Sequence, residues 1–315
     1  MKPYAFGVDI GGTTIKLGLF ETTGRLLEKW EIATDIGDCG KQILSDIAVG
    51  IAAKMAERKL SVADVSGVGL GVPGPVLEDG TVVKCVNLGW GVFNVEKELA
   101  NMTGMPVRAG NDANVAALGE MWQGGGEGFS NVVMVTLGTG VGGGVIVDEK
   151  IVTGAFGAGG EIGHIQMRTD ETECCGCGKR GCLEQYASAN GIVKEAGKLL
   201  NSSPHSSILR ENQTLTAKYI FAAAGNGDEL ATEVIEGMGK DLGRALSYIS
   251  CVCDPQVFVI GGGVANAGAI VTDTIQKHYR RFAFHASRNA AFKLATLGND
   301  AGMYGSVKLL LSGHR

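Results

Sequence analysis

Four cysteines lie within nine positions of the sequence, in the stretch CCGCGKRGC at 174–182. Cys175, Cys177 and Cys182 are spaced C-x-C-x4-C, and His164 lies eleven residues before the first of them. Three thiolates and one imidazole are a common donor set for a structural, tetrahedral Zn²⁺, and the intervening glycines allow the tight turns that such a loop needs. The spacing therefore predicts a zinc site. The alternative for His164 is an ordinary hydrogen-bonded residue of the core.

Two carboxylates accompany this segment. Glu161 precedes His164 by three residues, and Glu184 follows the last cysteine by two. Because a bound zinc fixes one imidazole nitrogen, the other nitrogen is left for a partner or a ligand. With the amides of Asn87 and Asn111, these groups can donate to and accept from the hydroxyls of a polyol. The alternative for each glutamate is a solvated surface charge.

Two glycine-rich stretches, VDIGGTTIK at 8–16 and LGTGVGGG at 137–144, do not match the P-loop pattern. Both nevertheless predict turns whose exposed amides can receive phosphate oxygens. Asp9 ends the first strand and could hold Mg²⁺, which prefers one or two carboxylates together with substrate phosphates. A third glycine cluster, at 261–263, could run alongside the ribose or base of the nucleotide. Each turn alone is no more than a hairpin, but the three together predict nucleotide binding.

Asp112 lies in the stretch GNDANVAALGE at 110–120, where a strand is expected to hand over to a helix. One interpretation is a helix cap, since Asp is among the favoured N-cap residues. The other is a general base, because a helix N-terminus favours the ionised carboxylate, which can accept a proton from an attacking hydroxyl. Phosphoryl transfer needs little beyond such a base, charge neutralisation and alignment.

An internal sequence repeat indicates how these residues are positioned. VDIGGTTIKLGLFE at 8–21 and VTLGTGVGGGVIVD at 135–148 share a strand, a glycine-threonine turn and a second strand, at an offset of 127 residues. The repeat predicts two α/β halves of related topology with a ligand cleft between them. The alternative is two unrelated glycine-rich hairpins.

Hydrophobic periodicity gives the remaining elements. A helix is expected over 39–59 from the repeat of Ile43, Ile47, Ile51 and Met55, and a long helix is expected after Asp228. Strands are expected at 4–10, 14–20, about 27–33, 65–73, 107–110 and 257–263, further helices at 111–122 and 301–311, and a surface loop at 201–213. The helix at 301–311 is expected to return and pack on the first half.

Length and composition limit the class of protein. A chain of 315 residues exceeds the usual size of a single core, and the expected domains are 1–118 with about 300–315, and 119–299. A net charge of -5 disfavours a nucleic-acid binder. The sequence contains no uninterrupted apolar run long enough for a membrane-spanning helix, so no membrane span is expected. The start, MKPYAFGVDI, has no signal-peptide pattern, so a cytoplasmic location is expected. In that reducing compartment Cys39, Cys85, Cys251 and Cys253 are expected to be packing residues.

Six motifs occur together and in order: DIGGT at 9–13, VPGP at 72–75, NDAN at 111–114, GTGVGGG at 138–144, EIGH at 161–164 and CGCGKRGCLE at 175–184. In this combination the sequence resembles the ROK family of sugar kinases and repressors, and within it the bacterial glucokinases. The resemblance runs from residue 4 to the C-terminus. It implies an actin-like, hexokinase-like (ribonuclease H-like) two-domain α/β fold, use of ATP with Mg²⁺, and phosphoryl transfer to the 6-hydroxyl of glucose.

The resemblance also implies roles for individual residues. Asp112 would be the catalytic base. The sugar would be lined by Gly74, Asn87, Asn111, Asp112, Glu161, His164 and Glu184. The nucleotide and its metal would be faced by Asp9, Gly11, Gly12, Thr13, Thr14, Lys16, Gly138, Thr139, Gly140 and Gly262. Structural zinc would be held by His164, Cys175, Cys177 and Cys182. Homodimers are common in the family, so a homodimer is expected.

Several alternatives remain at this point. Cys174, next to the first expected ligand, could replace Cys175 in the zinc site. Fructose, mannose, N-acetylglucosamine and N-acetylmannosamine are substrates of relatives with a similar pattern. A sugar-responsive repressor would need an additional DNA-binding domain before the first phosphate strand, and a filament-forming actin relative would need neither the sugar carboxylates nor the zinc motif.

Overall fold

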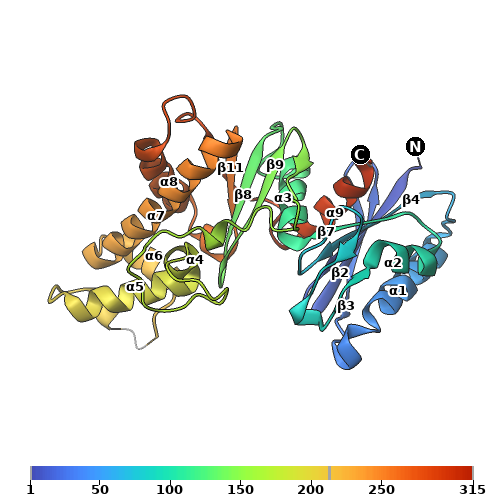
Figure 1. Ribbon diagram of the computed structural model, residues 1–315, viewed down its shortest axis with the longest axis horizontal. Coiled ribbons are helices and arrows are strands. Elements are labelled where there is room, and N and C mark those ends of the chain that lie inside the picture. The colour runs from blue at the N-terminus through green and yellow to red at the C-terminus, as the bar shows by residue number, and fades with distance from the viewer. Residues whose placement is uncertain (1, 212–213, 314–315) are drawn as a thin grey trace. The chain divides into compact units, whose positions relative to one another are not determined.

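A computed structural model describes residues 2–211 and 214–313 of the chain (Figure 1). The chain divides into two compact units. The described part of the first comprises 2–128, 144–160 and 297–313, and that of the second comprises 129–143 and 161–296 apart from 212–213. The domain limits expected from the sequence stay a prediction.

The first sheet has the strand order β3-β2-β1-β4-β7. Its strands are β1 (Tyr4–Ile10), β2 (Thr14–Glu21), β3 (Leu26–Ala33), β4 (Val65–Val72) and β7 (Val107–Asn111). Strands β1, β2 and β3 form an antiparallel meander, whereas β4 and β7 run parallel to β1. The carboxyl ends of β1, β4 and β7 therefore share one edge, which brings Asp9 and Asn111 to the same side of the sheet.

The C-terminal helix α9 (Ala301–Leu311) packs closely on this sheet. A Cβ on Gly69 would lie 1.9 Å from the carbonyl oxygen of Ser306, and a Cβ on Gly7 would lie 2.3 Å from that of Met303. Only glycine permits so short a separation between strand and helix. The helix expected over 301–311 is confirmed, and the contacts place it on the sheet of the first unit.

The other helices of the first unit are α1 (Ile43–Arg58), α2 (Val95–Thr103) and α3 (Asp112–Gln123). The predicted start of the first helix at residue 39 is wrong. A 3-10 turn at Gly37–Gly40 comes first, with Asp38 and Cys39 in the left-handed region, so α1 begins only at Ile43. Of the predicted stripe of α1, Ile43, Ile47 and Ile51 are buried, whereas Met55 is only partly buried and Leu44 is buried in addition.

The second sheet repeats the plan of the first, with the order β10-β9-β8-β11-β12. Its strands are β8 (Val132–Leu137), β9 (Val141–Val147), β10 (Lys150–Ile151), β11 (Val257–Gly261) and β12 (Ala291–Leu294). In both sheets the third, second and first strands are followed by two strands parallel to the first. The shared order confirms that the two glycine hairpins belong to a repeated topology and rejects unrelated hairpins.

The helices of the second unit are α4 (Glu184–Ala187), α5 (Ala189–Ser202), α6 (Ala217–Gly225), α7 (Glu229–Cys253) and α8 (Ala269–Phe282). Helix α7 begins directly after Asp228, as the sequence predicts, and Asp228 caps it by accepting a hydrogen bond from the N–H of Ala231. The loop predicted at 201–213 is less irregular than expected, because α5 extends into it and a 3-10 turn at Ile208–Arg210 buries Leu209. Residues 212–213 of that loop lie outside the described residues.

Two expectations about composition can be compared with the structure. Cys39 and Cys251 are exposed, so their assignment as packing residues is wrong, whereas Cys85 is buried. Across 2–211 and 214–313, no helix is both long enough and apolar enough to cross a bilayer.

Candidate active site

Asp112 is the first residue of α3, and the cap of that helix is Asn111. The Oδ1 atom of Asn111 accepts hydrogen bonds from the N–H groups of Ala113 (3.1 Å) and Asn114 (3.2 Å). The interpretation of Asp112 as a cap is therefore wrong. Its Oδ1 accepts a bond from the N–H of Ala113 (2.8 Å), and the helix N-terminus favours its ionised form. This environment is suitable for a carboxylate that accepts a proton.

Gly74 lies beside this helix start. The Nδ2 group of Asn111 donates to the carbonyl oxygen of Gly74 (3.3 Å), which ties the loop after β4 to the cap of α3. Cys85 belongs to the same neighbourhood, because burial and then the charge of Asp112 raise the pKa of its thiol. Asn87 is exposed on the 3-10 turn Val86–Leu88, which follows Cys85 directly.

Asp9 is the second carboxylate of this site. Burial raises the pKa of Asp9 to about 6, Lys16 opposes the increase, and the charge of Asp112 adds to it. Asp9 and Lys16 are register partners across β1 and β2. Two carboxylates that influence each other electrostatically, one at a strand end and one at a helix start, are suitable ligands for a divalent cation.

Gly302 supports Asp9 and was not singled out from the sequence. A Cβ on Gly302, at the start of α9, would lie 2.6 Å from Cγ of Asp9 and 2.7 Å from its Oδ2. The carboxylate therefore lies directly against the helix backbone. No local motif links these two positions, which are almost the whole chain apart.

The turn between β1 and β2 is closed by a bond from the N–H of Gly11 to the carbonyl oxygen of Thr14 (3.0 Å). The hydroxyl of Thr34 donates to the carbonyl oxygen of Gly11 (2.7 Å). Gly12, Thr13 and Thr14 are exposed. The turn is thus fixed at its base and open at its tip, as a phosphate-binding turn requires.

The equivalent turn of the second unit comprises residues 138–140, between β8 and β9. The N–H of Gly138 donates to the carbonyl oxygen of Gly140 (3.0 Å), and the carbonyl oxygen of Gly138 accepts from the N–H of Ala189 at the start of α5 (2.8 Å). A Cβ on Gly140 would lie 2.7 Å from Oε2 of Glu184. The turn therefore packs directly against one of the predicted sugar-binding carboxylates.

A cavity of about 690 Å³ lies beside this turn in the second unit. Its lining is Gly138, Thr139, Ala189, Ala217, Lys218, Phe221, Ala222, Gly263, Val264, Asn266 and Ala267. Mostly apolar walls with a few polar groups suit a heterocyclic base. Gly262 itself is not part of this lining, but its φ of 83° turns the chain from β11 into the cavity wall at Gly263. The wall contributed by α6 was missed, because a single aromatic in an apolar helix resembles a core residue.

The four predicted zinc ligands come together. The donor atoms of His164, Cys175, Cys177 and Cys182 all lie within 4.8 Å of one another. Nδ1 of His164 is 3.7 Å from Sγ of Cys175, and the sulfurs of Cys177 and Cys182 are also 3.7 Å apart. A tetrahedron with Zn–S bonds of about 2.3 Å has edges of about 3.7 Å, so the donor set fits zinc.

The geometry also separates Cys174 from Cys175. Cys175 is buried and belongs to the cluster, whereas Cys174 is exposed and pairs through its backbone with Arg180. The side chain of His164 is partly exposed and lies near sulfur, which favours its interpretation as a zinc ligand over that as a core residue.

The two nitrogens of His164 face different groups. Nδ1 faces the cysteines and lies 3.7 Å from Oε1 of Glu184, while Nε2 lies 3.9 Å from Oε2 of Glu161. Glu184 also lies against the cluster, with Oε1 2.9 Å from Sγ of Cys175. Glu161, His164 and Glu184 thus form one polar group at the zinc cluster, to which hydroxyls of a ligand could bind through Nε2 and the carboxylates.

Comparison with known proteins identifies the family of the chain. Residues 5–312 match the ROK family. The chain is 40% identical to the glucokinase of Halalkalibacterium halodurans over 304 residues, which is 95% of this chain and 92% of that protein. It is 32% identical to the N-acetyl-D-glucosamine kinase of Salmonella gallinarum over 98% of this chain and 99% of that one.

Among solved structures, the chain is similar to a ROK family glucokinase from Streptomyces griseus in complex with glucose and AMPPNP. The TM-score is 0.73 at 34% identity, with 98% of this chain and 100% of that chain covered. With the duplicated sheet order and the full-length match, the fold is the actin-like, hexokinase-like α/β fold of these sugar kinases. The chain belongs to the ROK family.

Proposed function

We propose that the protein is a glucokinase that transfers the γ-phosphoryl group of ATP to the 6-hydroxyl of glucose, giving glucose 6-phosphate and ADP. The observation that carries the proposal is the carboxylate of Asp112, held at the N-terminus of α3 beside the capping Asn111 and influenced by the charge of Asp9. The family relationship, with a glucokinase at 40% identity, supports glucose as the sugar.

In this mechanism Asp112 accepts the proton of the 6-hydroxyl as that oxygen attacks the γ-phosphorus of ATP. The hydroxyls of the sugar bind to the backbone at Gly74, the amides of Asn87 and Asn111, and the group formed by Glu161, His164 and Glu184. Alignment of the attacking oxygen with the phosphorus then supplies much of the rate enhancement.

The nucleotide is assigned to the two glycine turns, with roles for residues 11–14, Lys16, residues 138–140 and Gly262, and its base to the cavity beside α6. Asp9 would hold Mg²⁺ together with the phosphate oxygens. When bound, that ion neutralises charge on the transferred group. The open tips of the turns leave backbone N–H groups for the phosphates.

Zinc is assigned a structural role. The cluster of His164 with Cys175, Cys177 and Cys182 has four protein donors and no open coordination position, which is typical of structural zinc. It would orient the His164 ring so that Nε2 faces the ligand. We also propose a homodimer, a cytoplasmic location and a place in glycolysis, on the basis of the family relationship alone.

Coupled ADP release across a panel of hexoses and N-acetylhexosamines tests the function. We expect the highest kcat/KM for glucose, because kcat/KM measures discrimination between substrates. The alternative, an N-acetylhexosamine kinase, is favoured by the 32% identity to an N-acetyl-D-glucosamine kinase. A higher kcat/KM for N-acetylglucosamine or N-acetylmannosamine would select that alternative, and no sugar-dependent ADP release would reject both.

A further inference from the structure

The segment after His164 pairs with the segment that carries Cys182. The N–H groups of Met167 (2.7 Å) and Arg168 (3.3 Å) both donate to the carbonyl oxygen of Gly181, and the N–H of Leu183 donates to that of Ile165 (2.9 Å). Gly181 has a φ of 74°, and a Cβ there would lie 1.7 Å from the carbonyl oxygen of Arg168. The backbone of Arg168 is thus in tight contact with the residue before a zinc ligand.

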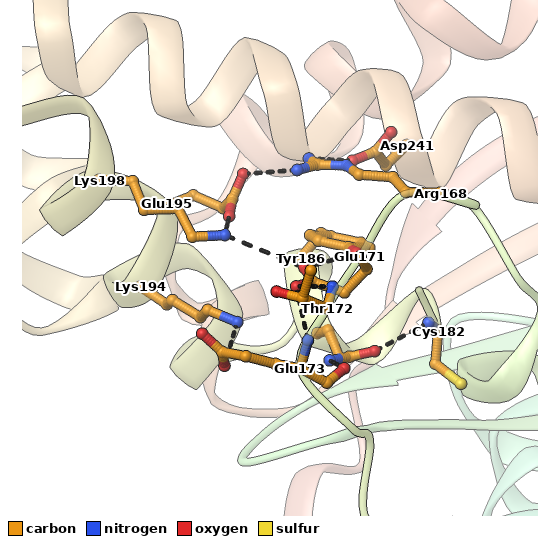
Figure 2. A network of polar contacts seen from close by, with 11 residues as sticks. Arg168, Glu171, Thr172, Glu173, Cys182, Tyr186, Lys194, Glu195, Lys198 and Asp241 are labelled. Carbon is orange, nitrogen blue, oxygen red and sulfur yellow. Dashed lines mark hydrogen bonds and ion pairs between the residues drawn. The ribbon is translucent and has the colours of Figure 1, made fainter. Parts of the chain in front are cut away.

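The side chain of Arg168 joins this segment to two helices. Nη1 donates to Glu195 of α5 (2.8 Å) and Nη2 donates to Asp241 of α7 (2.9 Å), as Figure 2 shows. The pairs are partly buried, so solvent screens them less than it screens surface pairs. Each of the two terminal nitrogens, Nη1 and Nη2, therefore has its own carboxylate.

The guanidinium also lies over the ring of Tyr186, in α4, at 3.7 Å from the ring centroid. Tyr186 is 1% exposed, and its hydroxyl donates to Oε2 of Glu171 (2.9 Å) (Figure 2). The other oxygen of Glu171 accepts from the N–H groups of Thr172 and Glu173. The bond from the N–H of Glu173, followed by that from the Tyr186 hydroxyl, lowers the pKa of Glu171 to about 2, so Glu171 stays an ionised acceptor.

Helix α4 is short, and its first residue is Glu184. Gln185 also belongs to the network, since its Oε1 accepts from the N–H of Cys182 (3.0 Å) and its Nε2 donates to the carbonyl oxygen of Glu173 (3.1 Å). A four-residue helix has too few internal hydrogen bonds to hold its own orientation. The position of Glu184 must therefore come from its surroundings.

We propose that Arg168 is a positioning residue, which fixes α4 against α5 and α7 and thereby places the carboxylate of Glu184 for the sugar. This inference rests on the proposed function. The side chain of Arg168 bonds to Glu195 and Asp241 and stacks on Tyr186. Arg168 acts through Tyr186 and through the backbone of Gly181. Lysine could not replace it, because a single ammonium provides neither the fork nor the stacking plane.

Arg168→Lys is the test, with Arg210→Lys as the matched control. Arg210 belongs to the same unit and also donates two bonds, from Nε to the carbonyl oxygen of His205 (3.1 Å) and from Nη2 to that of Ser203 (2.5 Å), but it lies outside the network. We expect Arg168→Lys to raise the KM for glucose at least about fivefold and to leave the KM for ATP within about twofold, because misplaced binding groups weaken alignment. Arg210→Lys should change neither.

Tyr186→Phe is the second variant, and it tests the same network if Arg168→Lys does not fold. It keeps the ring under Arg168 and removes only the bond to Glu171, so we expect a rise of about two- to fivefold in the KM for glucose. Calorimetric titration with glucose, without ATP, should show in each variant a loss of affinity that matches its own rise in KM, while zinc content stays at the wild-type level.

The results of these measurements distinguish failure of the proposed function from failure of the positioning role of Arg168. If the wild-type protein releases no ADP with glucose, the proposed function fails whatever the variants do. If the wild type is active and both variants keep a KM and a calorimetric Kd for glucose within twofold of it, the positioning role of Arg168 is overturned. An equal rise in the KM for ATP and for glucose would also overturn it, because that result indicates general loosening of the unit.

Discussion

His164 turns Nδ1 toward Sγ of Cys175, at 3.7 Å, and turns Nε2 toward Glu161 on its other side. One nitrogen therefore faces the proposed zinc ligands and the other faces Glu161, a proposed sugar ligand. Because the ring is rigid, a change at the cysteines would also move Nε2 relative to Glu161.

Zinc content follows from this arrangement. The wild-type protein should contain about one zinc per chain by elemental analysis, and Cys177→Ser should lose it because one of four donors is removed. Cys174→Ser is the matched control, since Cys174 is the neighbouring exposed cysteine outside the cluster. Zinc loss from Cys174→Ser equal to that from Cys177→Ser, or zinc-free wild-type protein with full activity, would contradict the assignment.

The ionised carboxylate of Asp9 should lower the free energy of unfolding of the metal-free protein. Its folded-state pKa of about 6 exceeds the ordinary aspartate value of 3.8, so the folded state is disfavoured as pH rises through about 6 and Asp9 ionises. Asp9→Asn should raise the free energy of unfolding in EDTA at pH 8, by up to about 3 kcal/mol, and the gain should shrink toward pH 5. Urea denaturation at both pH values measures the difference.

Asp64 is the control for that experiment. Hydrogen bonds from Ser61 lower the pKa of Asp64, so its ionised form favours the folded state at pH 8 and the contribution falls as pH drops through its folded-state pKa. Asp64→Asn should change stability in the opposite direction. If Asp9→Asn were destabilising at pH 8, the burial of a charged carboxylate at this position would be refuted.

Asn111 has a structural role and a proposed sugar role, which a second asparagine can separate. Asn94 caps α2 in the same way, accepting from the N–H of Lys97 and donating to the carbonyl oxygen of Asp79. Loss of either cap should lower the free energy of unfolding by about 1 kcal/mol. Only Asn111→Ala should also raise the KM for glucose, at least about fivefold. Equal KM values in the two variants would remove Asn111 from the sugar site.

The elements predicted correctly are those whose signal is local. The glycine turns, the start of α7 after Asp228 and the cysteine spacing each lie within a few consecutive residues, so local geometry determines them. The contact of Gly302 with Asp9 and the pairing of Arg168 with Asp241 join distant segments, and only the folded chain reveals them. The predicted start of α1 is wrong because the left-handed conformation of Asp38 and Cys39, which separates the turn from the helix, has no signature in hydrophobic periodicity.

The most direct test of the account is the kcat of Asp112→Asn with saturating ATP, Mg²⁺ and glucose. This variant keeps the shape of the side chain and removes its ability to accept a proton. The account predicts a fall in kcat of at least about 100-fold, with glucose affinity and the free energy of unfolding close to wild type. A kcat near the wild-type value in a folded, glucose-binding variant would contradict Asp112 as the base.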